Sequence, residues 1–270
     1  VTRALVRLSK TPPAFKTFLG VFESVDEASQ AVSDIIAAGI VPGALEMMDQ
    51  LITQALEEAY HFGFPLDAGA VLIVELDGLA KGVEEQAKRV DEICRRNNAS
   101  EVRLARDAAE RAALWKCRKR AFGAIGRLSP NYVTQDGVVP RSKLPEIMQF
   151  IRSVSDRYCL RIPNVFHAGD GNIHPLILYD EREPDQVKRA LQAGNDILGK
   201  CIELGGSVTG EHGIGAEKID FMSRQFAAED LDAMKQLRRV FDPKNQCNPH
   251  KMFPGAKRCA EFVLKKQVTA

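Results

Sequence analysis

The stretch GAVLIVELDG, residues 69–78, decides the fold of this chain. It is a run of aliphatic and β-branched residues with a glycine at each end, which is typical of a buried strand. Similar strand-like segments alternate along the sequence with helical segments of roughly 10–16 residues. This alternation predicts a layered domain in which helices pack on a sheet.

The flanking segments carry clear helix and strand signals. Ser24 and Glu27 have capping-box spacing and Gly39 suits a helix end, so they predict a helix over residues 24–39. Pro145 suits the first turn of a later helix. Other expected helices span residues 49–60, 82–98, 107–128, 142–160, 183–206 and 229–243. Other expected strands lie within residues 1–13, 13–22, 43–48, 100–107 and 131–140.

The character of the strands separates two fold classes. Strands of a parallel, doubly wound sheet are buried on both faces and read as continuous apolar runs, and only a few segments here do so. We therefore expect an α+β fold, a ferredoxin-like antiparallel sheet with helices packed on one face. No repeat, low-complexity tract or flexible linker divides the chain, so residues 1–270 are expected to form one domain.

Composition excludes several functions. The 37 basic residues nearly balance the 36 acidic ones, which leaves no basic surplus for binding nucleic acid. No apolar run reaches the roughly 18–20 residues of a membrane span. The six cysteines form no C-x-x-C pair, so free thiols and a cytoplasmic location are expected.

Polar residues are concentrated in VFHAGDGNIHPLIL, residues 165–178. Asp170–Gly171 is a strong signal for a two-residue hairpin turn, which would pair His167 with His174. Their Cβ atoms would then lie about 4.5–5.5 Å apart. Two imidazoles so placed could share one metal ion. The alternative is an ordinary turn flanked by two structural histidines.

A second polar stretch, GGSVTGEHGIGAEK at residues 205–218, has five glycines, which let backbone approach a ligand closely. Glu211 could complete a His-His-carboxylate set that leaves positions open for substrate. An imidazole titrates near neutrality, so the adjacent His212 could accept a proton. The alternative is a glycine-rich turn with a surface Glu–His pair. The residues thus predict a metal-assisted acid–base site but no particular reaction.

These two stretches, followed by FDPKNQCNPHKMFP at residues 241–254, resemble the C-terminal portion of the FAD-linked 2-hydroxyacid oxidases and dehydrogenases. Lesser motifs such as VELDG, residues 74–78, occur in the matching order, and the resemblance runs from about residue 1 to 262. It is greatest to members that oxidise glycolate. It implies that a small D-2-hydroxy acid is oxidised to the 2-oxo acid by hydride transfer to FAD.

The resemblance also implies a role for each polar residue. The metal ligands would be His167, His174 and Glu211, and the ion zinc, manganese or iron. His212 would take the hydroxyl proton, and Arg118 would bind the substrate carboxylate, although on residues alone Arg118 could equally be a solvated helix position. Asn172 and Asn248 would contact the flavin, with residues 241–270 a tail that returns to the flavin domain.

Some features depart from the family pattern. Thr134 and Gln135 stand where relatives acting on larger diacids carry a lysine, which fits a small substrate. His250 replaces a usual glycine. No glycine-rich phosphate-binding loop precedes the motifs, so the N-terminal FAD-binding domain is expected to be absent from this chain.

The resemblance implies that the chain works in a complex. A second flavoprotein subunit and an iron–sulfur subunit are the expected partners, and the complex could hold the protein at the inner face of the membrane. The isolated chain would then be inactive, serving as a structural or interaction domain. A metal-dependent hydrolase is a further alternative, since a His-His-Glu site also suits activation of water.

Overall fold

The computed structural model describes residues 3–254 and contains an eight-stranded sheet. The strands follow the order β4-β1-β3-β2-β7-β8-β5, with β6 also paired to β8. Every pairing is antiparallel, as expected for an α+β fold. The strands are β1 (Ala14–Phe22), β2 (Ala44–Asp49), β3 (Ala70–Gly78), β4 (Glu101–Leu104), β5 (Asn131–Thr134), β6 (Gly137–Val138), β7 (Asn164–His167) and β8 (Asn172–Tyr179).

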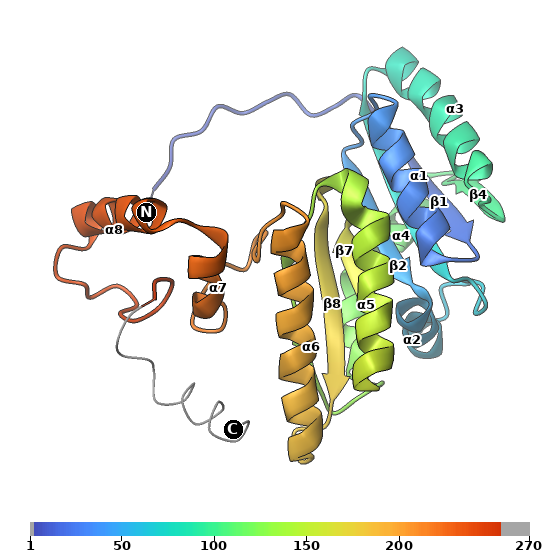
Figure 1. The fold of residues 1–270 in the computed structure, drawn as a ribbon. Helices are drawn as coiled ribbons and strands as arrows, with labels where there is room; N and C mark the ends of the chain where they lie inside the picture. Colours follow the sequence, from blue (N-terminus) through green and yellow to red (C-terminus); the bar gives the residue numbers. More distant parts are fainter. Residues whose placement is uncertain (1–2, 255–270) are drawn as a thin grey trace.

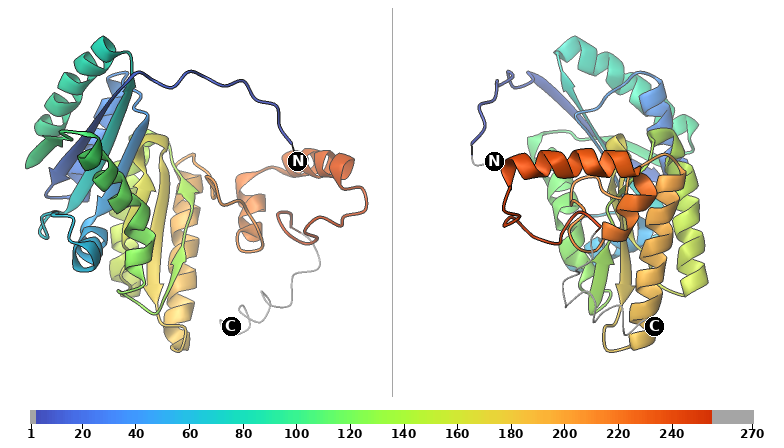
Figure 2. Two further views of the ribbon diagram at one scale, coloured as in Figure 1. Left: turned by 180° about the vertical axis from the view of Figure 1, so that it is seen from behind. Right: turned by 60° about the vertical axis from the view of Figure 1, so that its left-hand side comes forward.

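Helices cover both faces of this sheet rather than the one face expected. Helices α1, α3, α5 and α6 lie on one face, and α2 and α4 lie on the other (Figures 1 and 2). The reason is visible in β3, whose residues 70–76 are buried on both faces and need cover on each. The helices are α1 (Val25–Ala37), α2 (Gln50–Tyr60), α3 (Ala80–Arg96), α4 (Ala108–Ile125), α5 (Leu144–Tyr158), α6 (Pro184–Glu203), α7 (Ile219–Gln225) and α8 (Ala228–Phe241).

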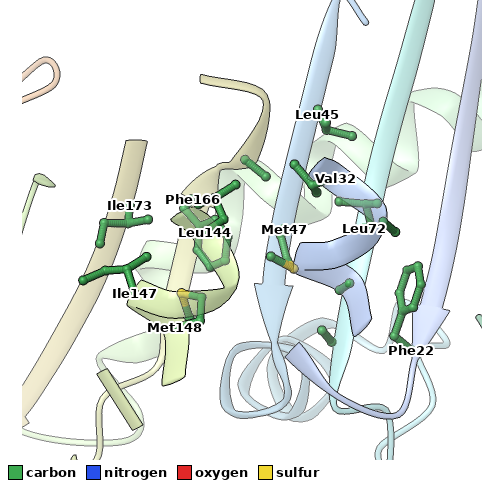
Figure 3. Packing of buried hydrophobic residues seen from close by; sticks show 14 of the residues in the cluster. Phe22, Val32, Leu45, Met47, Leu72, Leu144, Ile147, Met148, Phe166 and Ile173 are labelled. Carbon is green, nitrogen blue, oxygen red and sulfur yellow. The ribbon is translucent and has the colours of Figure 1, made fainter. Parts of the chain in front are cut away.

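Two hydrophobic cores result. The larger one lies between the sheet and the four-helix layer and includes Phe22, Leu72, Ile147 and Phe166 (Figure 3). The second lies under α2 and α4 and contains the alternate residues of the same strands, such as Ile73. Burial of these side chains, at roughly 25 cal/mol per Å² of apolar surface, is the main force that holds α4 against the sheet.

Local sequence signals were mostly reliable for the elements. The Ser24–Glu27 capping box forms with both hydrogen bonds at 3.2 Å. Residues 3–13, however, form no strand, so that part of the N-terminal prediction is wrong; Leu5 and Leu8 are fully exposed there and pair with no neighbour. Residues 131–140 form two short strands instead of one, and α7 was not expected.

The C-terminal part of the described chain lies apart from the sheet. Helices α7 and α8 project beyond α6, as Figure 1 and the left-hand view of Figure 2 show. Within residues 3–254 no helix combines the length and apolarity that a bilayer crossing requires. Residues 255–270 of the expected tail lie outside the described residues.

Candidate metal centre

A row of polar side chains crosses the face of the sheet that α4 covers. Glu46 of β2 is paired with His167 of β7, and His167 with Asn172 of β8. Directly opposed residues of an antiparallel pair share one face. His174, two residues beyond Asn172, points to the same face because side chains alternate along a strand. Four polar groups from three strands therefore meet at one place.

The hairpin that presents the histidines differs from the predicted one. The two-residue turn that would pair His167 with His174 is wrong, since His174 pairs with Val165. Residues 168–170 form a 3₁₀ turn, and Gly171 closes it in the left-handed region at φ 72°. The two histidines still converge because they are diagonal neighbours, with ring centroids 5.5 Å apart.

Each of these histidines is oriented through its Nδ1 atom. The Nδ1 atom of His167 lies 2.8 Å from Glu46 Oε1, and this hydrogen bond raises the pKa of His167. The Nδ1 atom of His174 lies 3.3 Å from the carbonyl oxygen of Gln135, and burial lowers the pKa of His174. Nδ1–H groups donated to these acceptors leave both Nε2 lone pairs free, which is how metal-binding imidazoles are usually held.

Glu211 faces both free nitrogens. Its Oε1 lies 3.3 Å from Nε2 of His174 and 3.7 Å from Nε2 of His167. Ligand atoms about 2.1 Å from a tetrahedral ion are about 3.4 Å apart, so the separations suit a divalent metal such as zinc. The Glu211 side chain is 54% exposed, which leaves room on the open side of the set. The residues present thus fit a metal ion.

The loop that carries Glu211 is fastened by Asp136, a residue that sequence reasoning missed. This fully buried carboxylate accepts hydrogen bonds from the Thr209 hydroxyl at 2.7 Å and from the backbone N–H groups of residues 210–212 at 3.0–3.3 Å. Burial alone would raise its pKa, but these donors and Lys218 lower the pKa of Asp136 to about 2. The signal in the sequence that could have identified Asp136 was its position as a carboxylate inside the strand predicted at residues 131–140.

Glycines let this loop lie directly on the hairpin. A Cβ atom at Gly210 would lie 2.5 Å from the Asn172 amide nitrogen, and one at Gly206 would lie 1.9 Å from the carbonyl oxygen of Val138. Ser207 and Val138 exchange two backbone hydrogen bonds at 2.8 and 2.9 Å. The buried Asn172 side chain therefore stands between the hairpin and the loop.

His212 lies beside the set, with its Nε2 atom 3.7 Å from Glu211 Oε1. Its ring stacks on that of His174 at 5.1 Å and 8°, and it is about half exposed. A second combination of close donor atoms, Asp136 with His174 and His212, also occurs within residues 3–254. The oxygens of Asp136 already accept loop N–H groups. His167, His174 and Glu211 are therefore the better ligand set.

Helix α4 brings Arg118 to the site. Arg111, Trp115, Arg118 and Phe122 follow helical spacing and form one stripe that crosses the strands. Arg118 Nε and Nη2 lie 3.0 and 2.9 Å from Glu46 Oε2, and the ring of Phe122 meets that of His174 edge-on. Arg118 is only 7% exposed, so the alternative of a solvated helix position is wrong.

The structure does not bring every expected residue to this cluster. Asn248 lies in the turn after α8, where its carbonyl oxygen accepts a hydrogen bond from Arg238. One backbone hydrogen bond links this turn to the glycine-rich loop, from Met252 N–H to the carbonyl oxygen of Gly215 at 2.8 Å. A flavin contact for Asn172 and Asn248 stays a prediction.

The sequence is similar to that of several known proteins over nearly its whole length. The chain is 48% identical over 261 residues to the glycolate oxidase subunit GlcD of Escherichia coli K12, covering 97% of this chain and 52% of that protein. It is 41% identical to GlcD of Bacillus subtilis, covering 94% and 54%. It is 28% identical to a mitochondrial D-lactate dehydrogenase [cytochrome] of Arabidopsis thaliana, covering 94% and 45%. The chain thus spans about half the length of these relatives.

Solved structures and a family model complete the comparison. The fold matches p-cresol methylhydroxylase with substrate bound at a TM-score of 0.66 and 17% identity, over 88% of this chain and 52% of that one. The model for FAD linked oxidases, C-terminal domain, matches residues 11–252. This match covers most of the chain, and the motifs at residues 165–178 and 205–218 lie within it. The chain therefore belongs to the FAD-linked oxidases, as their C-terminal domain.

Proposed function

We propose that this chain is the substrate- and metal-binding domain of a flavin-dependent oxidoreductase that oxidises glycolate or a similar small D-2-hydroxy acid to the 2-oxo acid. The observation that carries the proposal is the meeting of two free imidazole Nε2 atoms and one carboxylate beside a buried arginine. The names of the relatives, glycolate oxidase subunit and D-lactate dehydrogenase, supply the substrate class.

Each residue has one task in this proposal. His167, His174 and Glu211 hold a zinc, manganese or iron ion, which neutralises the hydroxy-carboxylate and acidifies its hydroxyl when bound. Arg118 orients the carboxylate: its Nε donates to Glu46, and its buried Nη2 makes no hydrogen bond within residues 3–254. His212 accepts the hydroxyl proton on its imidazole as hydride leaves Cα for FAD.

The partners are part of the same proposal. FAD is held mainly by a domain outside this chain, with Asn172 and Asn248 at its edge. A second flavoprotein subunit and an iron–sulfur subunit take the electrons in the cytoplasm or at the inner face of the membrane. Two of the relatives are named as subunits of an oxidase, which supports a multi-subunit assembly. The alternative is that the chain alone is an inactive structural domain of that assembly.

Metal content and turnover test the proposal separately. The chain, purified without chelator or polyhistidine tag, should contain about one equivalent of zinc, manganese or iron, and His167→Ala or His174→Ala should abolish it. His61→Asn replaces an exposed histidine outside the cluster and is the matched control. In the flavin-loaded enzyme, His212→Ala should abolish glycolate and D-lactate oxidation but keep the metal. A metal-free wild type, or an active His212→Ala enzyme, would contradict the proposal.

A further inference from the structure

Glu46 joins the two halves of the site with one carboxylate. Its Oε1 lies 2.8 Å from Nδ1 of His167, and its Oε2 lies 3.0 Å from Nε of Arg118. The side chain is buried. Both oxygens are thus committed, one to a proposed metal ligand and the other to the proposed carboxylate-binding residue.

Ion-pair stability alone does not require this arrangement. A buried carboxylate needs a counter-charge, and Arg118 supplies it. The fold makes a comparable pair one strand away, where Glu75 of β3 accepts from Arg111 at 2.6 and 2.7 Å, from Trp115 at 2.6 Å and from Thr17 at 2.8 Å. Every partner of Glu75 is structural. Glu46 differs because one of its oxygens is hydrogen-bonded to an imidazole, that of His167, whose other nitrogen faces Glu211.

The cross-strand register fixes this geometry. Glu46 and His167 are directly paired, so the carboxylate approaches the Nδ1 side of the ring and turns the Nε2 side toward the loop. The His167 side chain is one-third exposed, and its other ring contact is the edge-on ring of His174. Without Glu46, the imidazole would lose the hydrogen bond on Nδ1 that sets its rotation about the χ angles. Such hydrogen bonds to the remote nitrogen also strengthen an imidazole as a ligand.

We propose that Glu46 is a positioning residue that holds His167 in its metal-binding orientation and fixes the guanidinium of Arg118 beside it. This inference rests on the proposed function. A metal ion on Nε2 would make Nδ1–H a stronger donor to Glu46, whose other oxygen holds Arg118, so metal and carboxylate binding would be coupled through this one side chain. Linkage makes the effect reciprocal.

Zinc titration of the full chain by calorimetry tests the inference. Glu46→Gln should weaken zinc binding about 10–100-fold, as loss of such an outer hydrogen bond typically does. Cobalt substituted for zinc should show a changed visible absorption band, which a merely structural role would not alter. Glu75→Gln is the matched control: it removes the comparable carboxylate under α4 and should leave zinc affinity within about 3-fold, because none of its partners is a ligand.

A second variant covers the case in which Glu46→Gln does not fold. Glu46→Leu with Arg118→Met replaces the buried pair by apolar groups, a change that proteins often tolerate. It should fold and still bind zinc about 10–100-fold more weakly than wild type. Wild-type affinity in either variant would overturn the role of Glu46. A wild-type chain that binds no zinc, manganese or iron would overturn the proposed function instead, so the two failures are distinguishable.

Discussion

Replacing Asp136 by asparagine is expected to release the loop that carries Glu211 and His212. The wild-type carboxylate accepts bonds from the Thr209 hydroxyl and three successive backbone N–H groups, and Lys218 Nζ lies 3.4 Å away. The Thr209 hydroxyl, the N–H groups of residues 210–212 and Lys218 all meet Oδ2, and an asparagine oxygen in that place carries no charge. The loop hydrogen bonds would therefore lose their charge assistance, and Lys218 would lose its counter-charge.

The lowered pKa of Asp136 gives the magnitude. A fall from 3.8 to about 2 corresponds to about 2.5 kcal/mol of stabilisation of the folded state by the ionised carboxylate. This figure already includes the attraction between the carboxylate and Lys218. We therefore expect Asp136→Asn to lower the free energy of unfolding by about 2.5 kcal/mol at pH 7. Because the pKa of Asp136 is lower in the folded state than in the unfolded state, this stabilisation is present above about pH 4 and is lost as pH falls toward 2.

Urea unfolding at several pH values measures this effect. The difference in the free energy of unfolding between wild type and Asp136→Asn should be largest near pH 7 and should become smaller below pH 4. Asp180→Asn is the control: hydrogen bonds from Arg182 also lower the pKa of Asp180 to about 2, but that pair is on the surface and its loss should hardly move the midpoint. A gap below about 1 kcal/mol at pH 7 would refute the reasoning.

Two further predictions concern stability. Gly210→Ala places a methyl group 2.5 Å from Asn172 and should lower the free energy of unfolding by about 1–3 kcal/mol. Gly82→Ala, in open space on α3, should raise the free energy of unfolding by about 0.5–1 kcal/mol, and equal effects of the two substitutions would contradict this account. Burial raises the pKa of Asp49 to about 6, so the folded state holds its proton more tightly than the unfolded state does. Stability should therefore fall by about 2.5 kcal/mol as pH rises from 4 to 7. Asp49→Asn keeps the helix cap and should remove that fall, as denaturation at both pH values can check.

Local patterns were enough to predict most elements and to single out the residues that meet at the candidate site. The capping box at Ser24 involves residues three apart, and the histidines with Glu211 are conspicuous in an apolar hairpin and a glycine-rich loop. The hairpin register was missed because Gly171 suits both a two-residue turn and the longer one found. Tertiary contact decides between them: a Cβ atom at Gly171 would lie 2.1 Å from the carbonyl oxygen of Val139.

The supporting carboxylates could not be read from local sequence. Glu46 meets His167 across 121 residues of chain, and Asp136 meets Glu211 across 75. A single acidic residue in a strand is equally compatible with exposure to solvent, and only the strand order shows which acids are enclosed. The same holds for Arg118: it shares the buried face of α4 with apolar residues such as Leu114 and Ala121, and an arginine on a helix is usually exposed.

The long separations within the site have a kinetic consequence. Contacts such as that between Glu46 and Arg118, 72 residues apart, close long loops and form only once β2, β7 and the crossing helix are assembled. Interactions absent from the folding transition state change the unfolding rate and leave the folding rate nearly untouched. An ion bound by residues of β7, β8 and the loop after α6 would therefore act chiefly by prolonging the lifetime of the folded domain.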